Sequence, residues 1–278
     1  MFGAIKHITL TLPTPAENLA CDEALLDACE AGGDGAGILR FWESPEYFVV
    51  VGYGNKVAAE VNEAACKQMN VPILRRCSGG GTVVQGPGCL NYSLILPFEE
   101  AGPLRTITAA NRFIMEKNRA AIESLLNEVG RVTPCAPGDA QPPASGGQGT
   151  ARPTNEVEIA VLGHTDLAII YSPSSILKFS GNAQRRRKSF LLFHGTFLLN
   201  FDLPLIEKLL QMPTKEPDYR AHRAHAEFVT NLNVSADAVK QAMQSAWEAK
   251  MALKEIPREQ ITELALEKYS TAEWNLRF

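Results

Sequence analysis

Three consecutive glycines follow a pair of arginines in the first half of the chain. The segment lies between two apolar, β-favouring runs and reads Arg75-Arg76-Cys77-Ser78-Gly79-Gly80-Gly81. Adjacent glycines weaken a strand, so they indicate either a bulge or tight hairpin, or close approach of the backbone to a ligand. Guanidinium and free backbone N–H groups both bind carboxylate or phosphate oxygens. The arginines therefore favour an anionic ligand at the glycine loop, residues 78–81.

A second polar segment lies between two strand-like runs and reads Lys178-Phe179-Ser180-Gly181-Asn182-Ala183-Gln184-Arg185-Arg186-Arg187-Lys188. Its four terminal basic residues are typical of a solvated loop or turn. Lys178 has apolar neighbours, so its ammonium either contacts a bound ligand or reaches the surface past them. His194, beside Gly195, fits a ligand contact or a hydrogen-bonded core histidine, and without further context the core histidine is favoured.

Composition narrows the class of protein. The chain has 278 residues, of which 45% are apolar and 21% charged, enough for a full globular core. A net charge of -4 argues against a general nucleic-acid binder. We find no secretory signal and no apolar run that could span a membrane. The six cysteines have no CxxC or metal-finger spacing, which indicates reduced thiols and a cytoplasmic protein.

Periodicity predicts an α+β fold with a mixed, mostly antiparallel sheet. A capping box at Thr14 and Glu17 begins the first helix, and the turn at 43–46 reads as a hairpin between two strands. Expected strands are 6–12, 38–42, 47–52, 71–76, 90–96, 157–162, 167–171, 190–193 and 197–201. Expected helices are 14–32, 57–69, 107–129, 203–210, 236–250 and 258–268.

One stretch, 133–155, is rich in Pro, Gly and Ala and has few large apolar residues. Such a segment cannot repay its ordering entropy, so we expect a mobile surface insertion. No repeat or second core is indicated. We therefore expect a single domain over residues 1–278, with 235–278 forming its C-terminal helices.

Together these segments resemble the lipoate–protein ligase A family, within the wider group of biotin and lipoate ligases and octanoyltransferases. The family's glycine motif matches residues 75–81 and its lysine motif matches residues 178–183. Further matches follow the family's order and are Asn18-Leu19-Ala20, Gly163-His164-Thr165-Asp166-Leu167, His194-Gly195-Thr196 and Trp274-Asn275. The resemblance implies a catalytic domain of the class II aminoacyl-tRNA synthetase and biotin ligase type.

The resemblance also implies an activity. Lipoate or octanoate attacks the α-phosphorus of ATP, and the acyl-AMP is then transferred to a lysine on a lipoyl domain. Acceptors of this kind are the 2-oxoacid dehydrogenase E2 or the glycine cleavage H-type protein. Lys178 would contact the phosphate and acyl oxygens, and Asp166 would bind Mg²⁺ or ribose. The residues implied to bind the acyl-adenylate are Arg75, Arg76, Ser78, Gly79, Gly80, Gly81, Ser180, Gly181, Asn182, Ala183 and His194.

Three features depart from the family pattern. Gln85 stands where the ligases usually have a histidine, and Thr165 replaces an asparagine before Asp166. The sequence ends at Phe278, where larger ligases continue into a small C-terminal domain. We therefore expect that a separate accessory subunit supplies this domain, or that the chain uses a preformed adenylate.

The main rival activity is ATP-independent octanoyl or lipoyl transfer through a cysteine thioester. Cys77 and Cys89 flank the glycine loop, and Cys135 precedes the lysine motif. Nearby arginines would lower a thiol pKa and favour the thiolate, although buried cysteines more often act as small apolar residues. None of the three clearly matches the transferases' nucleophile.

Other readings carry less weight. A non-catalytic acyl or lipoyl-domain binder would have no need of Lys178, Arg76 and the full glycine loop. A biotin ligase fits less well, because residues 180–184 resemble the lipoate branch. His222 and His225 have a metal-like spacing but no nearby partners, so we expect surface residues. The basic residues 185–188 form a candidate docking site for an acidic lipoyl domain.

Overall fold

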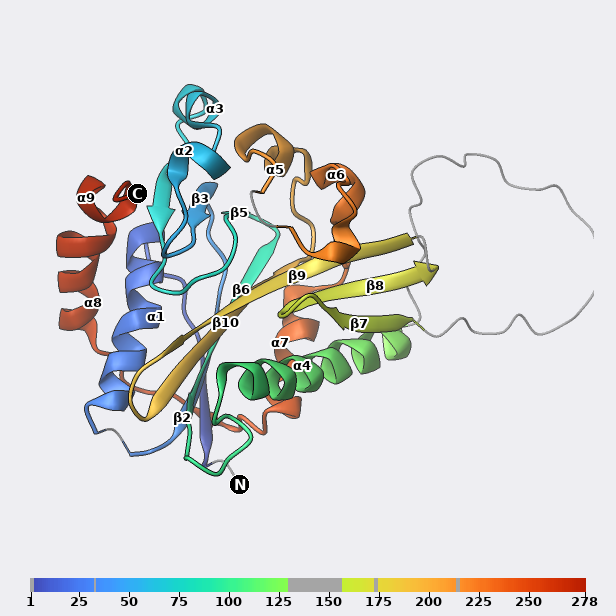
Figure 1. Cartoon of the computed structure of the whole chain (residues 1–278). Coiled ribbons are helices and arrows are strands. Elements are labelled where there is room, and N and C mark those ends of the chain that lie inside the picture. The colour runs from blue at the N-terminus through green and yellow to red at the C-terminus, as the bar shows by residue number, and fades with distance from the viewer. Residues whose placement is uncertain (1–2, 33, 130–156, 173–174, 214–215) are drawn as a thin grey trace, which may run out of the picture.

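Two β-sheets form the centre of the molecule. The computed structural model describes residues 3–32, 34–129, 157–172, 175–213 and 216–278. The larger sheet has eight strands in the order β11-β1-β2-β6-β10-β9-β8-β7 (Figure 1). These strands are β1 (Ile5–Thr9), β2 (Gly37–Trp42), β6 (Cys89–Pro97), β7 (Glu158–Leu162), β8 (Asp166–Ser172), β9 (Ser175–Arg186), β10 (Phe190–Leu198) and β11 (Met251–Ala252). Pairing from β2 through β6, β10, β9 and β8 to β7 is antiparallel, whereas β1 pairs parallel with both neighbours.

The smaller sheet has the order β4-β3-β5 and consists of β3 (Phe48–Val51), β4 (Ile73–Arg75) and β5 (Val83–Gln85). The expected hairpin at 43–46 is wrong, because β2 joins the large sheet and β3 the small one. The turn itself exists, since Ser44 Oγ donates a hydrogen bond to the Glu46 carbonyl. A local turn signal does not determine which strands pair, and both strands here are buried along their whole length.

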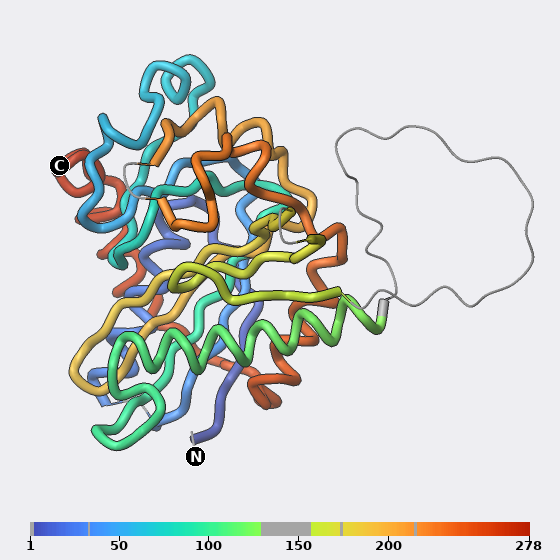
Figure 2. Tube along the Cα trace, turned by 45° about the vertical axis from the view of Figure 1, so that its right-hand side comes forward, coloured from blue at the N-terminus to red at the C-terminus, as the bar shows by residue number. Residues whose placement is uncertain are grey.

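Helices cover both faces of the large sheet. Figures 1 and 2 show α4 (Ile107–Val129) across one face, where it packs against α7 (Ala236–Ala246). On the other face α1 (Pro15–Glu30) packs against α8 (Arg258–Leu264) and the π-helical turn η2 (Ala265–Tyr269). The remaining short elements are α2 (Val57–Glu60), α3 (Glu63–Gln68), α5 (Pro204–Leu209), η1 (Asp218–Arg220), α6 (His225–Phe228) and α9 (Ala272–Asn275). The predicted α+β class with a mostly antiparallel sheet is thus confirmed.

Two helix predictions had different outcomes. The capping box is confirmed, because Thr14 Oγ1 accepts from the Glu17 N–H and Glu17 accepts from the Thr14 N–H. The single helix expected over 57–69 is instead split into α2 and α3. Val61 is extended and Asn62 caps α3 through its side chain, so a favourable cap interrupts the continuous apolar pattern.

The lysine motif lies within a strand. Residues 175–186 form β9 continuously, so the expectation of a loop or turn for the basic residues is wrong for 185 and 186. Arg187 pairs with Asp27 at 2.7 Å, and the Arg186 guanidinium lies 3.9 Å from the Phe98 ring centre. These basic side chains are held by intramolecular partners. A docking role for residues 185–188 stays a prediction.

Two expectations fall on residues outside those described: the insertion at 133–155 and the environment of Cys135. The extent of the domain over 1–278 also stays a prediction. Among the described residues, no helix combines the length and apolar character needed to cross a membrane.

Candidate functional site

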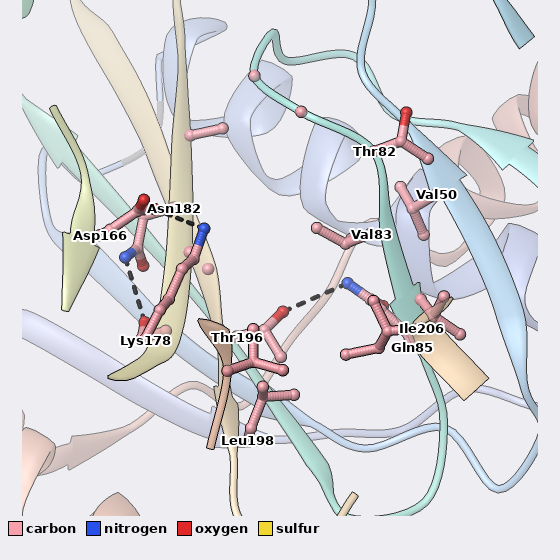
Figure 3. A pocket seen from close by; sticks show the side chains of 18 of the residues that line it. Val50, Thr82, Val83, Gln85, Asp166, Lys178, Asn182, Thr196, Leu198 and Ile206 are labelled. Carbon is pink, nitrogen blue, oxygen red and sulfur yellow. Dashed lines mark hydrogen bonds and ion pairs between the residues drawn. The ribbon is translucent and has the colours of Figure 1, made fainter. Parts of the chain in front are cut away.

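A cavity of about 310 Å³ is lined by residues of both sheets and of the segment from α5 to α6. Figure 3 shows Asp166, Lys178 and Asn182 on one side and the apolar side chains of Val50 and Ile206 on the other. The predicted site residues that line it are Arg76, Gly80, Gly81, Asp166, Lys178, Ser180, Gly181, Asn182, Ala183 and His194. The structure thus brings together two motifs separated by about a hundred residues of sequence. A charged group beside an apolar pocket suits an amphipathic carboxylate.

Lys178 is held at the cavity by an ion pair. Its Nζ lies 2.7 Å from Asp166 Oδ1, and the Tyr219 hydroxyl donates to Asp166 Oδ2 at 2.8 Å. The partly exposed pair keeps the ammonium in contact with solvent-accessible space. An anionic ligand can therefore reach the ammonium from the cavity side.

Arg76 clamps the glycine loop from within. Its guanidinium donates to the carbonyls of Gly79 at 2.5 Å and Gly81 at 2.8 Å, and to Ser78 Oγ at 3.1 Å. Burial lowers the pKa of Arg76 to about 10, so the group stays charged at neutral pH. Because the carbonyls turn inward, the loop backbone is fixed before any ligand binds.

The same loop leaves its N–H groups available. Among the described residues, none accepts a hydrogen bond from the backbone N–H of Gly79, Gly80 or Gly81. Gly80 has a φ of +88°, which requires glycine or strain. A Cβ at Gly52 would lie 2.1 Å from the Gly80 carbonyl oxygen, so a second glycine permits the close approach. Successive free N–H groups in such a turn form an anion-binding concavity.

Asn182 locks the lysine motif onto the neighbouring strands. Its side chain accepts from the Tyr92 hydroxyl at 2.6 Å and donates to the Thr165 carbonyl at 2.8 Å. A Cβ at Gly195 would lie 1.7 Å from Asn182 Oδ1, which explains the glycine in the His-Gly-Thr motif. Thr165, a departure from the family pattern, donates to the Asn182 carbonyl at 2.6 Å. Asn182 therefore acts as a framework residue as well as a cavity residue.

His194 is a buried, hydrogen-bonded residue, as the sequence favoured, and it also lines the cavity. Ligand contact by His194 stays a prediction. Its Nε2 lies 2.6 Å from Ser78 Oγ, and its Nδ1 lies 3.1 Å from Asp22 Oδ2. Asp22 also pairs with Arg40 at 2.6 Å. Sequence reasoning missed Asp22 and Arg40, although Asp22 follows the Asn18-Leu19-Ala20 match closely.

Arg75 is turned away from the cavity. Its fully buried guanidinium donates to the carbonyls of Gly52, Tyr53, Asn55, Trp274 and Asn275. The side chain therefore ties the C-terminal segment to the chain before α2, which lie side by side in Figures 1 and 2. Ser78 and Gly79 likewise do not line the cavity. Ser78 is buried and Gly79 is exposed. Ligand binding by Arg75 stays a prediction without geometric support.

The described cysteines do not fit a thioester nucleophile. Cys21, Cys29, Cys66, Cys77 and Cys89 are all buried, and none of them lines the cavity. The lowered Cys77 pKa that the transferase alternative would need is not found, because burial raises that pKa to about 12. The favoured interpretation of the cysteines as small buried apolar residues is confirmed for the five described. Burial also raises the pKa of the Cys89 thiol.

Several cavity residues come from a segment that sequence reasoning left unassigned. His225 was expected at the surface but is buried and lines the cavity together with Arg220. His222 is exposed, as expected, and lies 2.5 Å from Glu216. Gln85 also lines the cavity, with its Nε2 3.4 Å from Thr196 Oγ1 (Figure 3). Because η1 and α6 are each a single turn, they are too short for a periodic pattern of apolar residues to predict them.

Among the described residues that line the cavity, every carboxylate already has a partner. Its acidic lining residues are Asp22, Glu60 and Asp166. Asp22 is bonded to Arg40 and His194, Glu60 to Asn55 and Thr82, and Asp166 to Lys178 and Tyr219. Within the described residues, no three His, Cys, Asp or Glu side chains are arranged to hold a metal ion. A Mg²⁺ role for Asp166 therefore stays a prediction, because Lys178 and Tyr219 already occupy both of its carboxylate oxygens.

Comparison with known proteins places the chain among acyl-group ligases and transferases. It is 28% identical over 285 residues to octanoyltransferase LipM of Geobacillus kaustophilus, covering 95% of this chain and 94% of that one. It is 29% identical over 282 residues to lipoate-protein ligase A subunit 1 of Thermoplasma acidophilum, covering 96% and 95%. Both proteins align over almost their whole length.

Solved structures agree on the fold. The bi-partite lipoate protein ligase of Thermoplasma acidophilum matches with a TM-score of 0.73 at 23% identity, covering 99% of this chain and 96% of that one. Lipoate-protein ligase A bound with ATP matches with a TM-score of 0.67 at 25% identity, covering 99% of each chain. Fold and matches define an enzyme of the lipoate ligase and octanoyltransferase class. More narrowly, the chain belongs to the lipoyl protein ligase A/B catalytic domain family, whose model matches residues 14–249. The resemblance noted in the sequence is thereby confirmed.

Proposed function

We propose that this chain transfers a lipoyl or octanoyl group from an activated donor to a lysine of a lipoyl domain. The observation that carries the proposal is the single cavity that joins Lys178, the Arg76-clamped glycine loop and an apolar wall. The apolar wall suits a medium-length acyl chain. The cationic side suits the carboxylate of the free acid and the phosphate or thioester group of its activated form.

Of the two possible donors, we propose acyl-AMP made from ATP. The substrate carboxylate attacks the α-phosphorus, pyrophosphate leaves, and the acceptor amine then displaces AMP to form the amide. Both steps place negative charge beside Lys178 and the glycine loop. Prepositioned donors at such charge lower the barrier, and one donor is typically worth about 10² to 10³ in rate. The similarity to an ATP-bound lipoate-protein ligase A supports this form.

The Thermoplasma relative suggests the partners. It is named subunit 1 of a lipoate-protein ligase, and its structure is described as a bi-partite ligase with an E2 lipoyl domain. We propose that the present chain likewise works with a separate accessory subunit. Its acceptor would be a lipoyl domain of the E2 or H-protein type. A cytoplasmic location is part of this proposal, because the acceptors are metabolic enzymes.

Similarity to octanoyltransferase LipM favours a second candidate function, transfer from an octanoyl thioester without ATP. This route needs a nucleophile that can reach the cavity. The five described cysteines are buried away from it, which leaves Cys135 as the candidate thiol.

Acylation of a purified apo lipoyl domain separates the candidates. Three donors are compared: ATP with lipoate, synthetic lipoyl-AMP, and octanoyl-acyl carrier protein. Activity with lipoyl-AMP supports the ligase, and added activity with ATP shows that no accessory subunit is required. Activity with the carrier thioester alone, abolished by Cys135→Ser but not by Cys77→Ser, would establish the transferase. Binding without product from any donor would contradict both.

A further inference from the structure

Three buried side chains from separate elements form a hydrogen-bonded series behind the glycine loop. Asp22 comes from α1, His194 from β10, and Ser78 from the loop itself. Asp22 Oδ2 lies 3.1 Å from His194 Nδ1, and His194 Nε2 lies 2.6 Å from Ser78 Oγ. Their exposed fractions are 2%, 9% and 1%, so water has little access to replace these bonds.

The direction of the bonds follows from the charge on Asp22. Burial alone would raise the pKa of this carboxyl, but Arg40 and the hydrogen bond with His194 lower the pKa below its usual range. An ionised carboxylate can only accept, so His194 Nδ1 carries a proton. His194 Nε2 is then free to accept from the Ser78 hydroxyl in the neutral ring.

A carboxylate in the lining of an anion-binding cavity is unfavourable unless it is neutralised. Arg40 provides the neutralising charge, with its Nη1 2.6 Å from Asp22 Oδ1 and no exposed surface. Asn18 Oδ1 holds the same guanidinium at 2.7 Å. One carboxylate oxygen of Asp22 thus pairs with Arg40, and the other accepts a hydrogen bond from His194. Asp22 therefore stays ionised beside a compensating positive charge.

From His194 the series continues into the loop. Ser78 Oγ also accepts from Arg76 Nε at 3.1 Å, and Arg76 fixes the carbonyls of Gly79 and Gly81. A change in the tautomer of His194 would turn the Ser78 hydroxyl and disturb the clamp.

We propose that Asp22 is a positioning residue for acyl transfer, which fixes His194 with Nε2 as acceptor and so preorganises the glycine loop. This inference rests on the acyl-transfer function proposed above. Asp22 acts through His194 and Ser78, and it does not exchange protons with the substrate. A displacement of about 1 Å in an active site, caused by a residue away from the chemistry, can cost about 10² in rate.

Asp22→Asn tests the tautomer directly. Arg40 requires an acceptor, so the new amide oxygen would face Arg40 and the amide NH₂ would face His194 Nδ1. His194 would then carry its proton on Nε2. In ¹⁵N-histidine-labelled protein at pH 8, we expect the His194 signals to show Nδ1–H in the wild type and Nε2–H in the variant. A wild type with Nε2–H, or an unchanged signal in Asp22→Asn, would overturn the inference.

A second test compares the rate of acyl transfer in Asp22→Asn with that in Glu23→Gln, the matched control. Glu23 is the next residue in α1, is also a buried carboxylate, and bonds to Lys268 and Tyr269 away from the cavity. We expect kcat for transfer from lipoyl-AMP to fall about 10²-fold in Asp22→Asn and to stay near wild type in Glu23→Gln. Equal kcat values in the two variants would overturn the positioning role of Asp22 and leave the proposed acyl-transfer function intact. A wild type without transfer from any donor would instead contradict the proposed function.

Discussion

The Lys178 ammonium lies 2.7 Å from the Asp166 carboxylate because the residue opposite Asp166 is glycine. In the register of β8 and β9, Asp166 faces Gly181, three residues beyond Lys178. A Cβ at Gly181 would lie only 3.0 Å from Lys178 Nζ. Because Gly181 has no side chain, the Lys178 side chain can extend along β9 over Gly181 and reach the Asp166 carboxylate. The ion pair orders the ammonium at the cavity before an anionic substrate competes for it.

Replacing Lys178 by glutamine should reduce acyl transfer from lipoyl-AMP by about 10² to 10³ in kcat, because one donor to developing charge is lost. The matched control is Lys254→Gln, since Lys254 is exposed and does not line the cavity. Steady-state rates with an apo lipoyl domain make the comparison. Equal rates for the two variants would exclude Lys178 from the chemistry.

Alanine at Gly52 should displace the glycine loop. Its Cβ would lie 2.1 Å from the Gly80 carbonyl oxygen, so the backbone of one segment must move. A displacement near 1 Å in an active site can cost about 10² in rate, and we expect a loss of that size in kcat/KM. Gly54→Ala is the control, because nothing lies within 4 Å of its Cβ position. If both variants keep wild-type kcat/KM, the close approach of Gly52 and Gly80 has no catalytic value.

The sequence predicted those parts of the site that depend on local chemistry. Gly80 and Gly81 stood out because adjacent glycines are costly in a strand, whereas Lys178 was singled out by the resemblance of residues 178–183 to the family's lysine motif. The bounds of α4 were also predicted, since a long apolar period identifies a helix.

What the sequence did not predict depends on contacts between distant segments. Arg75 and Arg76 are adjacent, yet one binds the C-terminal carbonyls and the other the glycine loop. Successive residues of a strand point to opposite faces, but only the fold says which face holds the cavity. Asp22, His194 and Ser78 meet across 172 and 116 residues of sequence, which no periodicity can show.

Arg75 should matter for stability more than for ligand binding. Replacing it by alanine leaves several buried carbonyls without donors, and we expect the free energy of unfolding to fall by about 3 kcal/mol. Arg277→Ala, which removes an exposed cation stacked on Tyr53 and Trp274, should cost under about 1 kcal/mol. Urea denaturation measures both changes. A stable Arg75→Ala protein with weakened binding of lipoyl-AMP would instead support the ligand role predicted from the sequence.

His225 should make the fold sensitive to mild acid. Burial lowers its pKa from 6.5 to about 4, and the charges of Arg220 and Lys178 act in the same direction. Between these values the unfolded chain binds a proton that the folded chain does not, so stability is lost as pH falls from 6.5 towards 4. The free energy of unfolding of the wild type should therefore decrease relative to that of His225→Gln across this window, and the difference should be constant above pH 7. Denaturation at a series of pH values, without ligand, gives this difference directly. Parallel curves for the two proteins between pH 4 and 6.5 would show that His225 takes up its proton equally in both states.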